Sequence, residues 1–339
     1  MRAIGYQNPL PIDNPAALVD IELSNPSPTG LDLLVEIRAV SVNPVDTKVR
    51  RSAAPEAGQW KVLGWDAAGI VTATGPEATL FKPGDEVFYA GAIGRQGTNA
   101  EFHLVDERIV GHKPKSLNWA EAAALPLTAI TAWEALFDRL DVSNPRAGVP
   151  PVILIIGGAG GVSSIAIQLA SRHASLTVIG TASRPESAAW VRALGAHHVV
   201  DHSKPLAPQV AALGLGAPPF VFSTTNTESH LADIAQLIAP QGRLALIDDP
   251  KVLDINPFKR KCVSVHWEYM FARPAYETAD IAEQGKLLDE VSALIDVGTL
   301  RTTLGDTFGT INAENLKRAH VLLESGRAKG KIVLEGFGA

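Results

Sequence analysis

A glycine-rich segment carries the clearest chemical signal in this sequence. The unbroken apolar run Val152–Ile156 leads directly into Gly157–Val162 (GGAGGV), and helical periodicity follows over 163–172. Glycines let a turn approach a ligand closely, and the free N–H groups that open the next helix attract phosphate. The segment therefore predicts a dinucleotide pyrophosphate site made of Gly158, Ala159, Gly160, Gly161 and Val162. Ser163 replaces the usual third glycine, and a glycine-rich turn without a ligand is the alternative.

The end of the next expected strand indicates which nucleotide binds. NAD sites usually place an Asp or Glu about 20 residues after the glycines, where it bonds the ribose 2′-hydroxyl. Here 180–184 reads GTASR, and the next carboxylate is Glu186. Ser183 can donate a hydrogen bond, and the planar guanidinium of Arg184 can pair with a 2′-phosphate. We therefore expect NADPH rather than NADH, with a solvated Arg184 at a helix start as the alternative.

The elements that position these residues differ between the two parts of the chain. Residues 1–125 show short β-rich runs separated by turn residues, which is typical of a small barrel or sandwich. Beyond residue 151, apolar strands alternate with helices and predict βαβ units around a parallel sheet. These strands are expected at 152–156, 176–181, 198–201, 220–223, 243–247 and 263–266. Helices are expected at 119–125, 128–140, 279–297 and 312–325, and a last strand at 331–334.

Composition excludes several classes of function. The chain has 339 residues, enough for two domains, with 46% hydrophobic residues and a net charge of −6. This charge disfavours nucleic acid and anionic membranes as partners. Cys262 is the only cysteine, so the chain has no internal disulfide and no thiolate-rich zinc site. No secretory signal and no apolar run long enough to span a bilayer are found, so we expect a cytoplasmic protein.

Six further segments resemble the medium-chain dehydrogenase/reductase superfamily, in the order that the superfamily shows. They are 41–48 (SVNPVDTK), 63–69 (LGWDAAG), 82–87 (KPGDEV), 122–131 (AAALPLTAIT), 194–196 (LGA) and 327–334 (RAKGKIVL). The closest resemblance is to the quinone oxidoreductase branch and its bacterial zinc-type alcohol dehydrogenase-like proteins that lack zinc ligands.

The resemblance implies an α/β fold with two domains. A GroES-like, β-rich catalytic domain would comprise residues 1–126 and the returning segment 271–339. A Rossmann doubly wound parallel sheet would bind NADP over residues 127–270. The resemblance also implies an active site in a cleft between these domains and a homodimer that pairs through the strand 263–266.

The resemblance further implies that no metal is bound. Zinc alcohol dehydrogenases hold the metal with a Cys and with a His in a Gly-His-Glu segment. The matching segments here are Asn43-Pro44-Val45-Asp46, which has no Cys, and Gly64-Trp65-Asp66, in which Trp65 stands at the His position; a third Cys is missing too. His198 and His202 have a chelating spacing only on a helix; on the expected strand they would lie ~13 Å apart, too far to share one ion.

By the same resemblance, Asn43 and Asp46 lie beside the nicotinamide and the substrate as the catalytic pair. Asn43 would donate its amide to the substrate oxygen or the nicotinamide ribose. Asp46 would position groups by hydrogen bonding, with a helix N-cap as the alternative. The proton donor stays open between Lys48 and solvent. Lys331 on the returning tail would approach the cofactor. The favoured alternative is that Lys331 is a solvated charge.

Other cofactor contacts are implied residue by residue. Thr128 would touch the nicotinamide amide. Ser223 and Thr224, at the end of a strand, would face the adenine or its ribose. His202 would lie near the adenosine phosphate, with a surface histidine as the alternative.

Together these observations predict a zinc-independent NADPH:quinone reductase-like enzyme whose substrate is a small electrophile. An NADPH-dependent reductase of enone or enal double bonds is one alternative. A non-catalytic NADPH-binding sensor is another.

Overall fold

The computed structural model describes residues 1–145 and 148–338. The chain divides into two compact units: the first unit comprises residues 1–130 and 271–339, and the second unit comprises residues 131–270. The sequence places the first domain boundary after residue 126, whereas the units change after residue 130. No helix among the described residues is long and apolar enough to cross a membrane.

The first unit is organised around one long strand, β3 (Asp32–Val42), whose side chains alternate between the core and a half-exposed face. β3 pairs antiparallel with β5 (Ala67–Thr74), β7 (Phe102–Asp106) and β16 (Lys331–Glu335). The sheet continues through β6 (Glu86–Tyr89) to β8 (Val110–His112) on one side, and ends at β15 (Leu304–Thr307) on the other. A small second sheet contains β1 (Arg2–Tyr6), β2 (Val19–Glu22) and β4 (Lys61–Val62).

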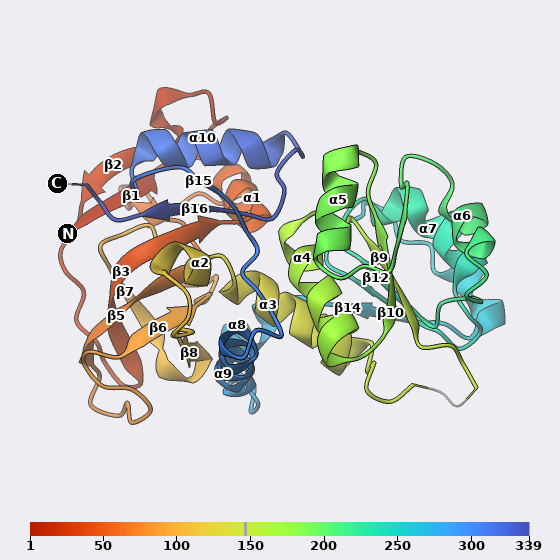
Figure 1. Cartoon of the computed structure of the whole chain (residues 1–339). Coiled ribbons are helices and arrows are strands. Elements are labelled where there is room, and N and C mark those ends of the chain that lie inside the picture. Colours follow the sequence, from red (N-terminus) through yellow and green to blue (C-terminus); the bar gives the residue numbers. More distant parts are fainter. Residues whose placement is uncertain (146–147, 339) are drawn as a thin grey trace. The chain divides into compact units, whose positions relative to one another are not determined.

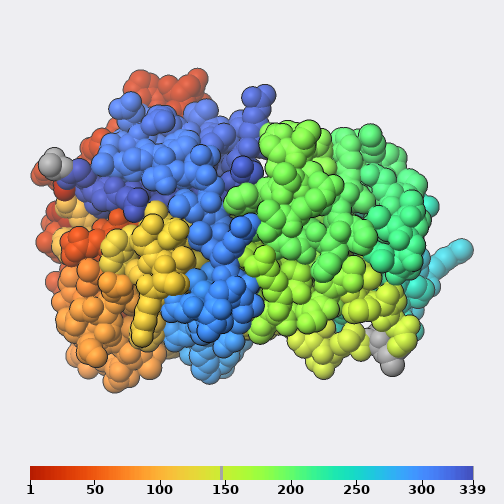
Figure 2. Space-filling view, viewed as in Figure 1, coloured from red at the N-terminus to blue at the C-terminus, as the bar shows by residue number. Residues whose placement is uncertain are grey.

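The C-terminal segment completes the first unit. β16 lies beside β3, in register from Ile332 opposite Val42 to Glu335 opposite Ala39 (Figure 1). The tail also supplies α8 (Ala272–Tyr276), α9 (Glu283–Asp296) and α10 (Ala313–Glu324). Figure 2 shows these C-terminal residues in blue, packed among the red and orange N-terminal ones. The return of 271–339 to the N-terminal region brings Lys331 next to the end of β3.

A short helix that begins where β3 ends, α1 (Pro44–Ser52), is anchored by a buried cation. Arg50 is fully buried and pairs with the Glu324 carboxylate on α10. Its other nitrogen atoms donate to the Leu10 carbonyl and to Nδ1 of His320. Burial lowers the pKa of His320 to about 3, so this ring is neutral and can accept. Arg50 therefore joins α1 to α10.

Replacing Arg50 with methionine should lower the free energy of unfolding by about 3–5 kcal/mol, because it leaves buried acceptors without their cation. Guanidinium chloride unfolding followed by circular dichroism measures this change. Arg51→Met, on the exposed side of the same helix, is the matched control and should change stability by less than ~0.5 kcal/mol. Equal losses in both variants would contradict the role given to Arg50.

The second unit contains a six-stranded, fully parallel sheet in the order β11-β10-β9-β12-β13-β14. This is the Rossmann strand order, so the predicted doubly wound sheet is confirmed. The strands are β9 (Val152–Ile156), β10 (Thr177–Thr181), β11 (His198–Val200), β12 (Phe220–Ser223), β13 (Arg243–Leu246) and β14 (Ser264–Trp267). The helices between them are α4 (Gly161–Gln168), α5 (Pro185–Ala193), α6 (Leu206–Ala212) and α7 (Thr227–Leu237).

Some helices differ from the expected ones. After α2 (Trp119–Ala123), α3 (Pro126–Trp133) continues as a π-helical segment, Glu134–Arg139, rather than as one α-helix to residue 140. α4 likewise ends in a π-helical segment, Leu169–His173. Apolar periodicity does not distinguish these hydrogen-bond patterns.

Candidate functional site

The glycine loop of the second unit is held by one threonine at the end of β10. The backbone N–H of Gly157 donates to Oγ1 of Thr181 (3.0 Å), and that of Gly158 donates to the Thr181 carbonyl (3.0 Å). Gly157 has φ of +81°, and a Cβ there would lie 2.7 Å from Oγ1 of Thr224. Both the backbone conformation and the contact thus require glycine at this position.

Helix α4 begins with Gly160 as its N-cap. Its first-turn N–H groups have no partner within the helix and point out of the N-terminus, where they favour an anion. Ser163 is fully buried, and its hydroxyl lies 2.9 Å from Oγ1 of Thr224. Thr224 in turn donates to the Ile156 carbonyl (2.8 Å). The serine in place of a third glycine therefore ties α4 to the end of β12.

The residues expected to select the nucleotide lie just after β10. Ser183 is exposed, and Arg184 is the N-cap of α5. The Arg184 side chain is 41% exposed and contacts the Glu186 carboxylate at 3.4 Å. An exposed pair of this kind is weak, because solvent screens it. The guanidinium can therefore turn to a stronger anion such as a phosphate.

His202 reaches the same loop through Thr181, whose hydroxyl lies 2.9 Å from Nδ1 of the ring. Burial lowers the pKa of His202, which favours a neutral imidazole. The Thr181 hydroxyl accepts from the Gly157 N–H and shares a proton with Nδ1 of His202, so this hydroxyl joins the ring to the glycine loop.

Ser223 lies apart from this group. It is fully buried, and its hydroxyl lies 2.7 Å from Oγ1 of Thr227, which is bonded to Asp248. Thr224 is half-buried at the loop. The structure thus joins the glycine loop and His202 through Thr181, while Thr224 contacts the loop from the end of β12. Thr181 was not expected from the sequence, because its role depends on the loop conformation.

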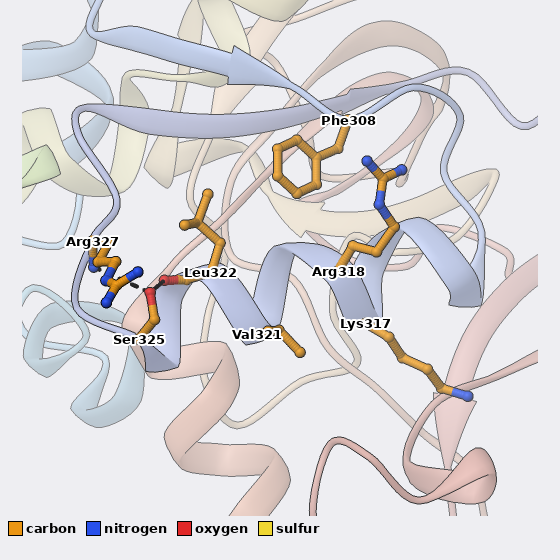
Figure 3. Close-up of a pocket in the computed structure, with 7 residues that line it drawn as sticks. All are labelled: Phe308, Lys317, Arg318, Val321, Leu322, Ser325 and Arg327. Atoms are coloured by element: carbon orange, nitrogen blue, oxygen red, sulfur yellow. Dashed lines mark hydrogen bonds between the residues drawn. The ribbon is translucent and has the colours of Figure 1, made fainter.

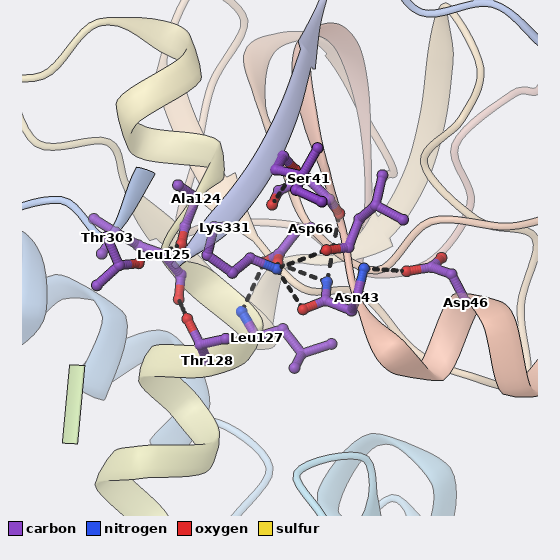
Figure 4. Close-up of polar contacts among 12 residues, drawn as sticks. Ser41, Asn43, Asp46, Asp66, Ala124, Leu125, Leu127, Thr128, Thr303 and Lys331 are labelled. Atoms are coloured by element: carbon purple, nitrogen blue, oxygen red, sulfur yellow. Dashed lines mark hydrogen bonds and ion pairs between the residues drawn. The ribbon is translucent and has the colours of Figure 1, made fainter. Parts of the chain in front are cut away.

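In the first unit, Asn43 belongs to a buried polar cluster with Asp66 and Lys331 (Figure 4). The Asn43 amide donates to Oδ2 of Asp66 (2.8 Å) and, over 3.4 Å, to the Ser41 carbonyl. Its Oδ1 accepts from the Lys331 ammonium, which also lies 3.0 Å from Oδ2 of Asp66. Asn43 is thus fixed in orientation by opposite charges on its two ends.

Lys331 is only 3% exposed. The favoured prediction of a solvated charge is therefore wrong: β16 runs through the core of the first unit and carries the ammonium inward. Its Nζ also donates to the Val42 carbonyl (3.1 Å).

Asp46 lies at the third position of α1, and Asn43 is the N-cap, so the alternative of Asp46 as the N-cap is wrong. Its Oδ2 accepts from the backbone N–H of Asn43 (2.7 Å). Its Oδ1 is buried and has no hydrogen-bond partner among the described residues. Burial, the largest influence, raises the pKa of Asp46 to about 7.

Thr128 lies on α3 next to the same cluster. Its hydroxyl donates to the Leu125 carbonyl (3.0 Å), while the backbone N–H of Leu127 donates to Oδ1 of Asp66 (2.7 Å). The start of α3 is thereby joined to Asn43 through one carboxylate. Asp66 directly follows the Gly64-Trp65 pair, and that position in the motif was the available signal for it.

The residues at this cluster do not fit a zinc ion. Trp65 is buried edge-on against Phe271 (6.0 Å between ring centroids), and its indole N–H donates to the Ala92 carbonyl (3.3 Å). Lys331 already supplies the cation that Asn43 and Asp66 contact. In the part of the chain that the structure describes, no group of three or more His, Cys, Asp or Glu side chains could hold a metal ion.

An open hollow of about 480 Å³ on the first unit lies over α10 (Figure 3). Two of its lining cations already have partners: Lys317 donates to the Pro15 carbonyl, and Arg318 covers the Phe308 ring at 5.0 Å. None of the predicted site residues lines it.

Comparison with known families matches both ends of the chain. The model of the alcohol dehydrogenase GroES-like domain matches residues 29–115, and that of the zinc-binding dehydrogenases matches residues 194–334.

Curated relatives and solved structures span nearly the whole chain. A zinc-type alcohol dehydrogenase-like protein of Staphylococcus aureus is 40% identical, over 98% of this chain and 99% of its own. A human mitochondrial NAD(P)H oxidoreductase is 30% identical, over 89% of this chain and 81% of its own. A Rhizobium etli structure that carries the name of a zinc-dependent alcohol dehydrogenase is 67% identical, with a TM-score of 0.98 over 100% and 99%. A quinone oxidoreductase structure from Pseudomonas syringae is 25% identical, with a TM-score of 0.82 over 98% and 99%.

Proposed function

Because this chain belongs to the quinone oxidoreductase branch of the medium-chain dehydrogenase/reductase superfamily, we propose that it is a zinc-independent, NADPH-dependent reductase of quinones or related electrophilic carbonyl compounds. The glycine loop that opens α4, with Arg184 and no carboxylate at the end of β10, is the observation that carries this proposal. NADPH, when bound, supplies the hydride.

The second unit offers backbone and side-chain donors for this cofactor. The N–H groups from Gly158 to Val162 would hold the pyrophosphate. Ser183 and Arg184 would hold the 2′-phosphate, with His202 and Thr224 near the adenosine. Ser223 is proposed near the adenosine too, although its buried hydroxyl is bonded to Thr227. Asn43 and Thr128, from the first unit, are proposed to contact the nicotinamide end.

Hydride transfer to a quinone leaves a negative charge on oxygen that fixed donors must stabilise. Asn43 and Asp46 are the proposed catalytic residues. Asn43 is held in one orientation by Asp66 and Lys331. To donate to the substrate oxygen, its amide would exchange the weaker of its two bonds, the 3.4 Å contact to the Ser41 carbonyl. The positive charge beside Asn43 and Asp66 is the Lys331 ammonium. Because a cation already occupies this place, the cluster supports a reaction that needs no zinc.

Substrate assays test this function directly. We expect NADPH oxidation, followed by absorbance, with 1,2-naphthoquinone as the acceptor. Turnover of an α,β-enone but not the quinone would instead make the chain a double-bond reductase. Binding of NADPH without oxidation by either electrophile would identify the non-catalytic sensor.

The Gly160→Ala variant should weaken NADPH binding without destabilising the fold. A Cβ at Gly160 meets only the Gly157 carbonyl, at 3.4 Å, so the free protein has room for a methyl group. If the pyrophosphate lies against this backbone, the methyl should raise the NADPH dissociation constant by roughly 10-fold or more, about 1.4 kcal/mol. Calorimetric titration measures this change, and thermal unfolding without ligand should be nearly unchanged. Unaltered NADPH affinity would contradict the proposed contact.

We further propose a cytoplasmic homodimer that pairs along β14. This strand is the last in its sheet, and Trp267 on it is 54% exposed. An edge strand with an exposed aromatic side chain suits pairing with a second copy. Sedimentation velocity should give twice the mass of the chain, and a monomer at micromolar concentration would contradict this proposal.

A further inference from the structure

The ammonium of Lys331 lies in a cage of oxygen atoms within the first unit. It contacts the Val42 carbonyl, Oδ1 of Asn43 and Oδ2 of Asp66. Lys331 and Asp66 are 3% and 0% exposed, so water screens their charges poorly. Burial raises the pKa of Asp66, while the Lys331 ammonium and the hydrogen bonds from Leu127 and Asn43 lower it. The negative charge of Asp66 therefore depends on the Lys331 ammonium beside it.

Asn43 connects this pair to a second carboxylate. Its side chain lies between Lys331 and Asp66, and its backbone N–H donates to Oδ2 of Asp46 (2.7 Å). Asp66 is satisfied on both oxygens, by Leu127 on Oδ1 and by Asn43 and Lys331 on Oδ2. Oδ1 of Asp46 is buried and has no hydrogen bond of normal geometry among the described residues, although the backbone N–H of Gly64 faces this carboxyl group. A buried carboxylate oxygen in this state is expensive unless it carries a proton.

We infer that Asp46 is the proton donor of the reaction, and that Lys331 and Asp66 are positioning residues that set when it holds its proton. This inference rests on the proposed reductase function. In the step, the Oδ1–H bond of Asp46 breaks as a new O–H bond forms on the anionic oxygen of the reduced substrate. The electron pair of the broken bond stays on the Asp46 carboxylate, and water later returns the proton. The substrate is reduced by the hydride that NADPH loses.

The charges around Asp46 predict the direction in which its pKa shifts when a neighbouring charge is removed. Burial, the largest influence, raises the pKa of Asp46 to about 7; the backbone N–H groups of Asn43 and Gly64 and the Lys331 ammonium lower it, and the Asp66 carboxylate raises it. Lys331 faces it from β16 and Asp66 from the residue before β5, while Lys48 on α1 itself is exposed. Removing the cation and removing the neighbouring carboxylate must therefore shift the titration of Asp46 in opposite directions.

Carbon-13 NMR of the ligand-free protein labelled at aspartate Cγ tests this prediction without turnover. The resonance missing from Asp46→Asn assigns Asp46. Lys331→Met should raise its titration midpoint by ~1–3 pH units, and Asp66→Asn should lower it by a similar amount. The double variant should return it toward the wild-type value, and circular dichroism confirms that each variant is folded. A midpoint that stays fixed, or that moves the same way in both single variants, would overturn the positioning roles.

The pH dependence of kcat tests the donor itself. A donor must be protonated, so kcat should fall above its titration midpoint. This basic limb should move upward in Lys331→Met and downward in Asp66→Asn, in step with the NMR midpoints. If the midpoints move while the limb stays in place, Asp46 is not the donor. NADPH affinity, measured separately in each variant, shows whether the proposed reductase function itself has failed.

Discussion

Arg184→Ala is expected to raise the dissociation constant for NADPH by ~10- to 100-fold, because charge-assisted hydrogen bonds to a phosphate contribute about 1.5–3 kcal/mol. NADH lacks the 2′-phosphate, so its affinity should change by less than about twofold, well under 1 kcal/mol. The Arg184 guanidinium is half-exposed and pairs only weakly with Glu186 at 3.4 Å, so the free protein loses little on substitution. Calorimetric titration with both coenzymes measures the effect.

Arg192→Ala provides the matched control, because Arg192 is an exposed arginine on the same helix, α5. It should leave both affinities unchanged, apart from a small salt-dependent contribution. If Arg184→Ala weakens NADPH and NADH equally, the residue does not read the 2′-phosphate, and the preference for NADPH must come from elsewhere.

Asp46→Asn is expected to make the protein more stable in alkaline solution and nearly neutral in its effect in acid. The pKa of Asp46 in the folded state is about 7, against an ordinary value of 3.8. The protonated form is therefore favoured in the folded state, and its contribution to stability is complete below pH 4 and lost as the pH rises through 7. A pKa difference of one between the folded and unfolded states corresponds to about 1.4 kcal/mol, so the ionised carboxylate costs up to ~4 kcal/mol at pH 8.

Asparagine removes this cost and keeps an oxygen to accept from the Asn43 N–H. Guanidinium chloride unfolding at pH 4 and pH 8 should therefore show a gain only at pH 8. Asp13→Asn, at an exposed position, is the control and should change stability by less than ~0.5 kcal/mol at either pH. A gain of equal size at both pH values would show that Asp46 does not titrate with a raised pKa.

Strands that are apolar throughout were the easiest part of the fold to predict. β9 and β12 lie at the expected residues, 152–156 and 220–223, because every side chain in them is buried. The short strands β1, β2, β4 and β15 were not predicted. They have only two to five residues, which is too short for an alternating or apolar pattern to be distinguished from that of turns.

The candidate site also has a part that the sequence predicts and a part that it does not. The glycine loop, Arg184 and His202 follow three successive strands, β9, β10 and β11, so sequence order was enough to suggest them. The cluster around Asn43 joins segments that are distant in sequence, including the start of α3 and the returning tail. Nothing in the local sequence around Lys331 shows that the chain carries it into the core, and a polar residue is expected outside by default.

Binding of the coenzyme to the second unit is the central claim. Isothermal titration calorimetry of the purified chain with NADPH and, separately, with NADH tests it most directly. We predict saturable heat with NADPH at one site per chain, and weaker binding of NADH. The titrations are made at several temperatures, so that a binding enthalpy near zero at one of them is not mistaken for absence of binding. No detectable heat with either coenzyme at any temperature would contradict coenzyme binding.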